Sequence, residues 1–176
     1  MKLFTKEQIY EGDKLTIERQ KISSTDLMER AGTQIFNWIN LRMQGAQVPI
    51  HIFCGIGNNG GDGYFIGIGL SELKKCVKFI NVLDHVKKSP LCEHAFKAAQ
   101  DSDFINAKTL KDISSKTVIV DAIFGIGGRI DLGSELKEIL SDCNRFESKI
   151  AIDVPTGLDS NTGEISQACF NADKTI

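Results

Sequence analysis

The sequence lacks the features of several protein classes. The five cysteines are odd in number, widely spaced and without a CxxC pair, which argues against a disulfide framework. No apolar run approaches the roughly 18 residues of a transmembrane helix, and the N-terminal residues lack a signal-peptide core. The formal net charge is only −2, so neither nucleic acid nor a membrane is expected as a partner. These absences together favour a cytoplasmic protein.

Several catalytic motifs are also missing. There is no G-x-S-x-G nucleophile motif and no Gly-Lys-Ser/Thr phosphate loop. The three histidines, His51, His85 and His94, lack the spacing of metal ligands. Cys54 has no basic neighbour that would activate its thiol. Nothing in the sequence therefore indicates a serine or cysteine nucleophile, a P-loop nucleotidase or a zinc enzyme.

What remains is the pattern of one α/β domain. The chain has 176 residues, of which 41% are hydrophobic and 25% charged, enough to bury one core. Short apolar runs alternate with helical patterns, and runs that are apolar throughout are typical of parallel strands covered on both faces. A doubly wound α/β sheet follows. We expect strands over 48–54, 76–83, 117–123 and 150–154, and helices over 64–75, 89–100 and 133–145.

A helical extension precedes this unit. Thr5 and Gln8 fit a capping box, with a helix that runs to about Glu18. A second helix is expected from Ser23 or Ser24, and its apolar positions recur every three to four residues as one buried stripe. The stripe consists of Leu27, Met28, Ala31, Ile35, Trp38 and Ile39.

Three loops rich in Gly, Asp, Asn or Thr follow the expected strands. They are Gly55–Gly63, Asp121–Asp131 and Asp153–Glu164. Because ligands of such folds lie beyond the carboxyl ends of the strands, three polar loops on one edge predict a binding site there.

The first loop contains the dinucleotide pattern G-x-G-x-x-G at Gly55, Gly57 and Gly60. Its bare backbone would let N–H groups approach a phosphate at the start of a helix. Asp84, after the next strand, could accept hydrogen bonds from ribose hydroxyls. The pattern alone is weak, but Asn58, Asn59, Gly61 and Asp62 exceed what a tight turn needs.

Two aspartates and one arginine in the other loops each allow two interpretations. Asp121 and Asp153 both follow apolar runs, so each carboxylate either caps local backbone or, beside other oxygen-bearing loops, binds a hard cation. Arg129 is either an ordinary surface arginine or a partner for phosphate.

Four motifs together resemble those of the NAD(P)H-hydrate epimerases. They are MERAG (28–32), GNNGGDG (57–63), DAIFGIG (121–127) and DVPTGLDSNTGE (153–164). The resemblance covers nearly the whole chain. It implies a Rossmann-like three-layer fold, a potassium ion, a frequent homodimer and the repair of NADH or NADPH whose nicotinamide ring has been hydrated, by interconversion of the R and S hydrates.

The resemblance also implies a set of site residues. Those implied to hold the hydrated dinucleotide are Asn58, Asn59, Gly60, Gly61, Asp62, Gly125, Ile126, Gly127, Gly128, Arg129, Ile130, Asp131 and Asp153. Those implied to hold potassium are Asn59, Asp121 and Thr156. Many relatives carry an Ala-Arg pair after the glycine loop, whereas this chain has Gly67, Ile68 and Gly69, so any contact of that arginine is absent or supplied elsewhere.

Inversion at the hydrated carbon can proceed by loss of water to an iminium-like cation and return of water to the other face. This needs an acid, a base and a nearby negative charge, all of which aspartates supply. We expect Asp153 as the acid/base group, with Asp62 second, and no redox cofactor.

Two other functions stay open at this stage. One is an NAD-dependent oxidoreductase that uses the glycine pattern in the usual way, and the other is a non-catalytic scaffold, as relatives of this fold are in mRNA decapping. We expect one domain over residues 1–176. The family domain normally continues with another strand and is often fused to a dehydratase acting on the S hydrate, so the end at Ile176 fits an excised domain or a shortened chain.

Overall fold

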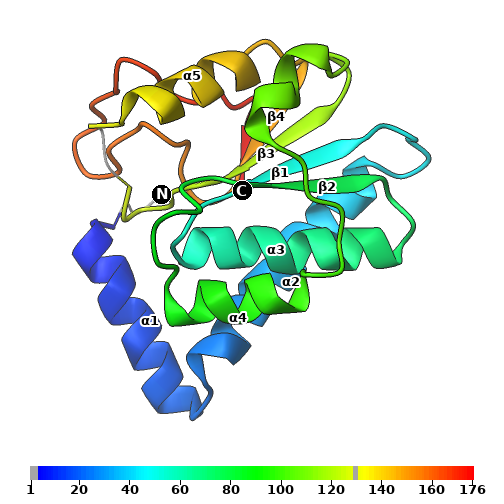
Figure 1. Cartoon of the computed structure of the whole chain (residues 1–176). Coiled ribbons are helices and arrows are strands. Elements are labelled where there is room, and N and C mark those ends of the chain that lie inside the picture. The colour runs from blue at the N-terminus through cyan, green and yellow to red at the C-terminus, as the bar shows by residue number, and fades with distance from the viewer. Residues whose placement is uncertain (1–3, 129–130) are drawn as a thin grey trace.

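The computed structural model describes residues 4–128 and 131–176. Within them, five parallel strands form one sheet in the order β2-β1-β3-β4-β5 (Figure 1). The strands are β1 (Ile50–Cys54), β2 (Val77–Asn81), β3 (Val118–Ala122), β4 (Ser148–Ala151) and β5 (Lys174–Thr175). The helices are α1 (Lys6–Gln20), α2 (Ser24–Arg42), α3 (Asn58–Glu72), α4 (Pro90–Ala98), the 3-10 helix η1 (Ala107–Asp112) and α5 (Ser134–Cys143). The predicted α/β class is confirmed.

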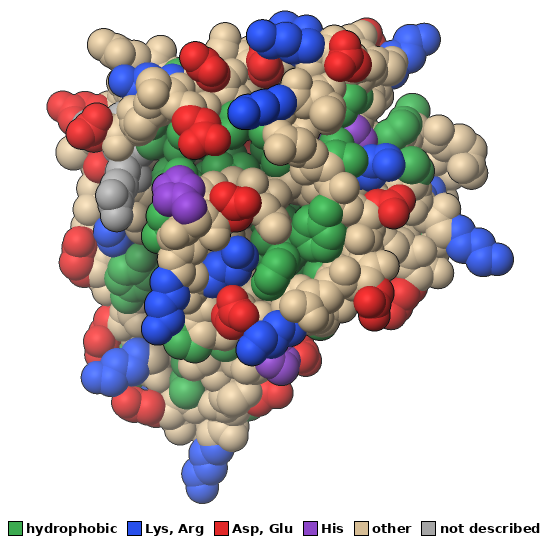
Figure 2. Space-filling view, in the orientation of Figure 1, with side chains coloured by type: hydrophobic (Ala, Val, Ile, Leu, Met, Phe, Trp, Pro, Cys, Tyr) green, Lys and Arg blue, Asp and Glu red, His purple; other side chains and the backbone are tan. Residues whose placement is uncertain are grey.

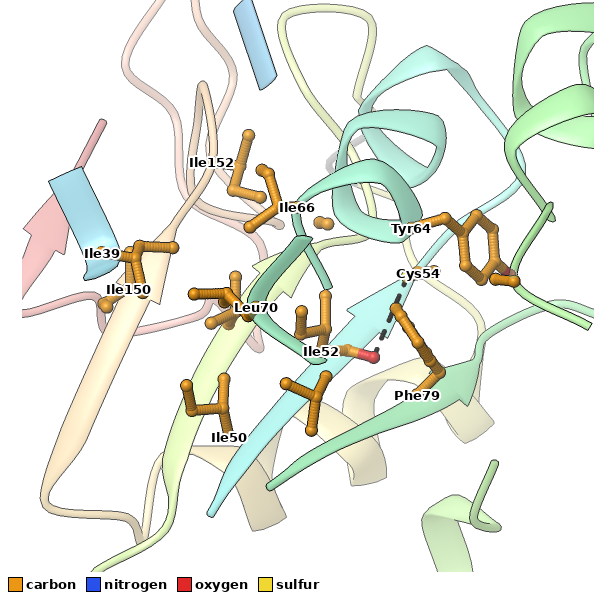
Figure 3. Packing of buried hydrophobic residues seen from close by; sticks show 14 of the residues in the cluster. Ile39, Ile50, Ile52, Cys54, Tyr64, Ile66, Leu70, Phe79, Ile150 and Ile152 are labelled. Atoms are coloured by element: carbon orange, nitrogen blue, oxygen red, sulfur yellow. Dashed lines mark hydrogen bonds between the residues drawn. The ribbon is translucent and has the colours of Figure 1, made fainter. Parts of the chain in front are cut away.

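Each face of the sheet carries its own apolar layer. On one face α2, α3 and α4 cover β1 and β2, and Figure 3 shows Ile52, Phe79 and Leu70 pointing into this layer. On the other face α5 and η1 pack over Phe53, Ile80 and Ile119. Because every strand direction is the same, all strand ends that lead into α-helices or long loops lie at one edge (Figure 1).

Helix α3 begins at Asn58, earlier than the expected start at residue 64. The glycine-rich segment is therefore the first part of the helix rather than a loop before it. A Cβ on Gly63 would meet the side chains of Ala122 and Cys54, and one on Gly67 would meet the ring of Phe79. Glycine at these positions lets α3 lie close against the sheet, which periodicity of apolar residues does not reveal.

The N-terminal helices begin as expected, each with a capping box, at Thr5 and at Ser23. The expected buried stripe of α2 is wrong in part, since only Ile39 of its members is fully buried and Ala31 is exposed. None of the residues of α1, all of which are described, is buried. Ala31 faces a cavity between α1 and α2, which explains its exposure.

Candidate functional site

The start of α3 is built by two close backbone contacts. A Cβ on Gly60 would collide with the carbonyl oxygen of Gly55, and one on Gly55 would collide with that of Ile123. The N-cap residue Gly57 has no side chain, so no side-chain oxygen accepts from the first N–H groups of the helix. Those N–H groups and the helix dipole suit a phosphate at this position.

Asp121 and Thr156 form a buried pair that joins β3 to the loop after β4. Asp121 Oδ2 accepts from the Thr156 N–H at 2.7 Å, and Oδ1 accepts from Thr156 Oγ1 at 2.8 Å and from the Ile123 N–H at 3.1 Å. Burial raises the pKa of Asp121 to about 6, although these three hydrogen bonds act in the opposite direction. The structure thus realises the capping interpretation and leaves a buried carboxylate.

Asp153 differs from Asp121, although both follow a strand. Its side chain reaches across to the loop after β3, where Oδ2 accepts from the Ile126 N–H at 2.8 Å. Its φ of 68° lies in the left-handed region, a conformation that a non-glycine residue adopts at a cost of about 1–3 kcal/mol. Gly125 permits the approach, since a Cβ there would collide with Asp153 Oδ2. Such strain at a loop carboxylate is typical of functional sites.

Asp62 lies in the second turn of α3 and faces this region. Its Oδ1 is buried and accepts no hydrogen bond from any described residue. Burial, with a smaller contribution from the nearby charge of Asp153, raises its pKa to about 7. Although the Asp153 residue is exposed, partial desolvation of its carboxylate also raises its pKa, and the hydrogen bond from Ile126 opposes that change. The two carboxyl groups therefore have different tendencies to hold a proton at neutral pH.

Helix α1 supplies a wall of the site that the sequence did not indicate. A cavity of about 530 Å³ lies between α1, α2 and the start of α3, and Tyr10, Asp13, Asn58 and Asp62 line it. Asp13 is close enough to raise the pKa of Asp153. The only available signal was the spacing of Tyr10 and Asp13, which places both on one helical face.

Contacts between loops hold α1 in place. The Lys6 N–H donates to Asn161 Oδ1 at 3.0 Å, in the third loop. Gly127, in the second loop, lies close to the Tyr10 hydroxyl of α1. A Cβ on this glycine would be only 2.9 Å from that oxygen. The strand-end loops and α1 therefore form one continuous site.

The remaining predicted residues lie around this site. Asn58 Oδ1 accepts from Ser89 Oγ at 2.9 Å, and the Gly128 N–H donates to the Gly125 carbonyl at 2.8 Å in a turn. Asp131 is exposed. Arg129 and Ile130 lie outside the described residues.

The residues that the resemblance assigns to potassium, Asn59, Asp121 and Thr156, each carry a side-chain oxygen. Within residues 4–128 and 131–176, no lysine, arginine or histidine forms an ion pair with the buried Asp121 carboxylate. The Asn59 side chain is buried; its Nδ2, which has no partner in the described structure, is a hydrogen-bond donor, so only its Oδ1 could bind a cation. One carboxylate, one hydroxyl and one amide are all oxygen donors, the type that hard cations prefer. In the same ranges, no cluster of three His, Cys, Asp or Glu has the arrangement of a metal site.

Comparisons with known proteins agree with the motifs. The family model described as "YjeF-related protein N-terminus" matches residues 24–176. The NAD(P)H-hydrate epimerase of Oenococcus oeni is 31% identical over 96% of this chain and 81% of its own, and that of Leuconostoc citreum is 30% identical over 100% and 79%. The bifunctional NAD(P)H-hydrate repair enzyme of Dictyoglomus turgidum is 30% identical over 100% of this chain and 35% of its own.

The fold is shared with a solved structure. The crystal structure of yeast ynu0, YNL200c, matches 99% of this chain and 79% of its own with a TM-score of 0.83 at 21% identity. No described helix is long and apolar enough to cross a membrane. Since the family model spans residues 24–176 and the epimerases align with nearly the whole chain, the protein belongs to the NAD(P)H-hydrate epimerase family of YjeF-related N-terminal domains.

Proposed function

We propose that the protein is an isomerase that interconverts the R and S hydrates of NADH and NADPH, as its relatives are named to do. The observation that carries this proposal is the pair formed by Asp62, in the second turn of α3, and Asp153, in the loop after β4. One carboxyl group lies buried with a pKa of about 7 and the other is held by a backbone N–H. Groups with such different environments suit acid and base roles at one carbon.

The pair supports a dehydration and rehydration sequence. A proton from Asp62 goes to the hydroxyl on the ring carbon, the C–O bond breaks, and water leaves with the bonding electron pair. Asp153, as a carboxylate, stabilises the iminium-like cation electrostatically. Water then adds to the opposite face and gives up a proton to a carboxylate, and proton exchange with solvent at both carboxyl groups then returns each of them to its starting state. We assign Asp153 to this second proton and Asp62 to the first.

The start of α3 supports the binding of the dinucleotide. The N–H groups of its first turn, those of Asn58, Asn59 and Gly60, precede the first intrahelical hydrogen bond and would donate to a pyrophosphate. The turn that runs from Gly125 to Gly128 would form the second wall of the substrate site. Binding at the phosphates leaves the nicotinamide ring near the two carboxyl groups.

A potassium ion held by Asn59, Asp121 and Thr156 is part of the proposal. The ion would supply positive charge beside a buried carboxylate and near a substrate phosphate. Asp121 and Thr156 hold the third loop against β3 through their own hydrogen bonds. Titration with potassium, sodium or choline at constant ionic strength tests for a specific ion.

We further propose that the protein is cytoplasmic and forms a homodimer. We also propose that it works beside an NAD(P)H-hydrate dehydratase, since some of its relatives are named bifunctional NAD(P)H-hydrate repair enzymes. All five cysteines, which lie within the described ranges, are free thiols, as a reducing compartment favours. Exposed apolar side chains on α1, including Ile9 and Leu15, support a self-associating surface. Light scattering coupled to size-exclusion chromatography measures the oligomeric state.

The direct test uses each purified hydrate. One epimer should approach the equilibrium mixture faster with the protein than without it, as chromatography of both epimers shows. No acceleration at neutral pH with potassium present would contradict the epimerase function and favour a scaffold. Formation of NADH from NAD with a 2-hydroxy acid would instead indicate an oxidoreductase.

A further inference from the structure

A second cavity, of about 540 Å³, lies on the face of the sheet opposite α3. It is bounded by the end of β2, the segment around η1, and α5. Val82, Phe104 and Leu136 contribute apolar walls, and Figure 2 shows apolar side chains in the recess below α5 with charged residues around it. A volume of this size is ordinary for a small-molecule site, and epimerisation as proposed above makes no use of it.

One chain segment, residues 82–89, connects the wall of this cavity to the start of α3. At one end of the segment, the Val82 N–H donates to the Cys54 carbonyl at 2.9 Å, beside the cavity. At the other end, the Ser89 N–H donates to the Ile56 carbonyl at 2.8 Å, and Ser89 Oγ donates to Asn58 Oδ1. A ligand with phosphates at the start of α3 therefore has the cavity along the same edge of the sheet.

The backbone at the cavity is strained. Leu83 has a φ of 60°, a left-handed conformation that is an outlier for a bulky residue. It directly precedes Asp84, whose carboxylate lies on the rim of the cavity after the end of β2. In dinucleotide-binding sheets, a carboxylate at this position accepts hydrogen bonds from the ribose hydroxyls of an adenosine group.

The charges around the cavity are mostly negative. Four carboxylates line it, against two ammonium groups; the carboxylates are Asp84, Glu135, Glu138 and Asp142, and the ammonium groups are Lys108 and Lys111. An additional phosphate on the ribose would bring two more negative charges to this surface. An unphosphorylated ribose would bring only hydroxyl donors for the carboxylates.

We propose that this cavity binds the adenosine half of the substrate and makes the protein prefer NADH hydrate to NADPH hydrate. The inference rests on the proposed function, in that the other half of the same dinucleotide lies at Asp62 and Asp153. The pyrophosphate at the start of α3 joins the two halves. Asp84 accepts from the ribose hydroxyls, and the apolar walls enclose the adenine ring.

Binding of 5′-AMP tests the cavity without any need for turnover. Calorimetry should show that the parent binds 5′-AMP at least about tenfold more tightly than adenosine 2′,5′-bisphosphate, a ratio that one to two charge-assisted hydrogen bonds supply. Asp84→Asn should lose most of this preference. Asp101→Asn is the matched control, because Asp101 is exposed and does not line the cavity. Ala107→Trp, which fills the cavity, should weaken 5′-AMP binding, with circular dichroism confirming that the variant is folded.

Kinetics separate this inference from the proposed function. The parent should use the hydrate of reduced nicotinamide mononucleotide, which lacks the AMP half, with a kcat/KM at least about tenfold below that for NADH hydrate. Equal kcat/KM values for the mononucleotide hydrate and for NADH hydrate would overturn the adenosine site. So would equal affinities of the parent and of Asp84→Asn for 5′-AMP and adenosine 2′,5′-bisphosphate. If no hydrate is epimerised while 5′-AMP binds in an Asp84-dependent manner, the proposed function fails and the adenosine site stands.

Discussion

Replacement of Asp62 by Asn should stabilise the protein while it removes activity. The Asp62 carboxyl group pays for its position in the site, because burial and the neighbouring Asp153 raise its pKa from 3.8 to about 7. Its Oδ1 gains no hydrogen bond from the described residues in return. The Asn side chain has nearly the same shape, carries no charge and needs no proton, so it avoids this cost.

The magnitude follows from the difference in pKa between the folded and unfolded chain. Each pKa unit corresponds to about 1.36 kcal/mol, so the full effect is about 4 kcal/mol. Below the unfolded pKa both states hold the proton and the carboxyl group costs nothing. Between that value and about 7 the folded state binds the extra proton, so the parent loses stability as pH rises. Between pH 5 and pH 8 the parent should lose about 3 kcal/mol relative to Asp62→Asn.

Urea unfolding of both proteins at pH 5 and pH 8 measures this difference directly, with Asp101→Asn as a control for the loss of an exposed carboxylate. The rate of hydrate epimerisation by the parent should fall above pH 7, as Asp62 loses its proton. The activity of the variant should be about 10²–10⁴-fold lower than that of the parent at every pH. A stability difference that is equal at pH 5 and pH 8 would refute a raised pKa for Asp62 and with it the proton-donor role.

Three further changes test the rest of the site. Asp153→Asn should lower turnover about 10²–10⁴-fold with dinucleotide binding largely kept, and a rate within a few-fold of the parent excludes Asp153 as an acid/base group. Asp121→Ala should lower the free energy of unfolding by about 1–3 kcal/mol for each donor left unpaired, and it should abolish any response to potassium. If the parent has the same Tm and the same hydrate affinity in potassium, sodium and choline, Asp121 is only a structural cap. Gly125→Ala should displace the Asp153 carboxylate and lower kcat about 10²-fold with little change in Tm. Gly133→Ala, where a Cβ meets open space, should leave kcat unchanged, and equal rates for the two alanine variants would contradict the role of this contact.

The sequence predicted the sheet because its signal is local. Runs such as 117–123 are apolar throughout, and that composition is compatible with a strand covered on both faces. The start of α3 was misplaced because glycine has low helix propensity, whereas its closeness to the sheet depends on Phe79 and Ala122, which are distant in sequence. Tertiary contacts outweighed propensity at this helix.

The candidate site shows the same division. The motifs indicated which loops meet, but they did not distinguish Asp121 from Asp153. In the structure Asp121 is buried and hydrogen-bonded through both carboxylate oxygens, whereas Asp153 is exposed and lies on strained backbone. The contribution of Tyr10 was not predicted, because its spacing from Asp13 on one helical face is common to many surface helices. Position in space, not residue type, assigns α1 to the site.

Helix α1 is fastened at its beginning but buries none of its described side chains. Its free energy of detachment is therefore a small fraction of the free energy of global unfolding, and its amides should exchange with solvent well before those of α3. A wall with so little stability of its own allows substrate to enter and product to leave while the sheet and its strand-end loops stay fixed.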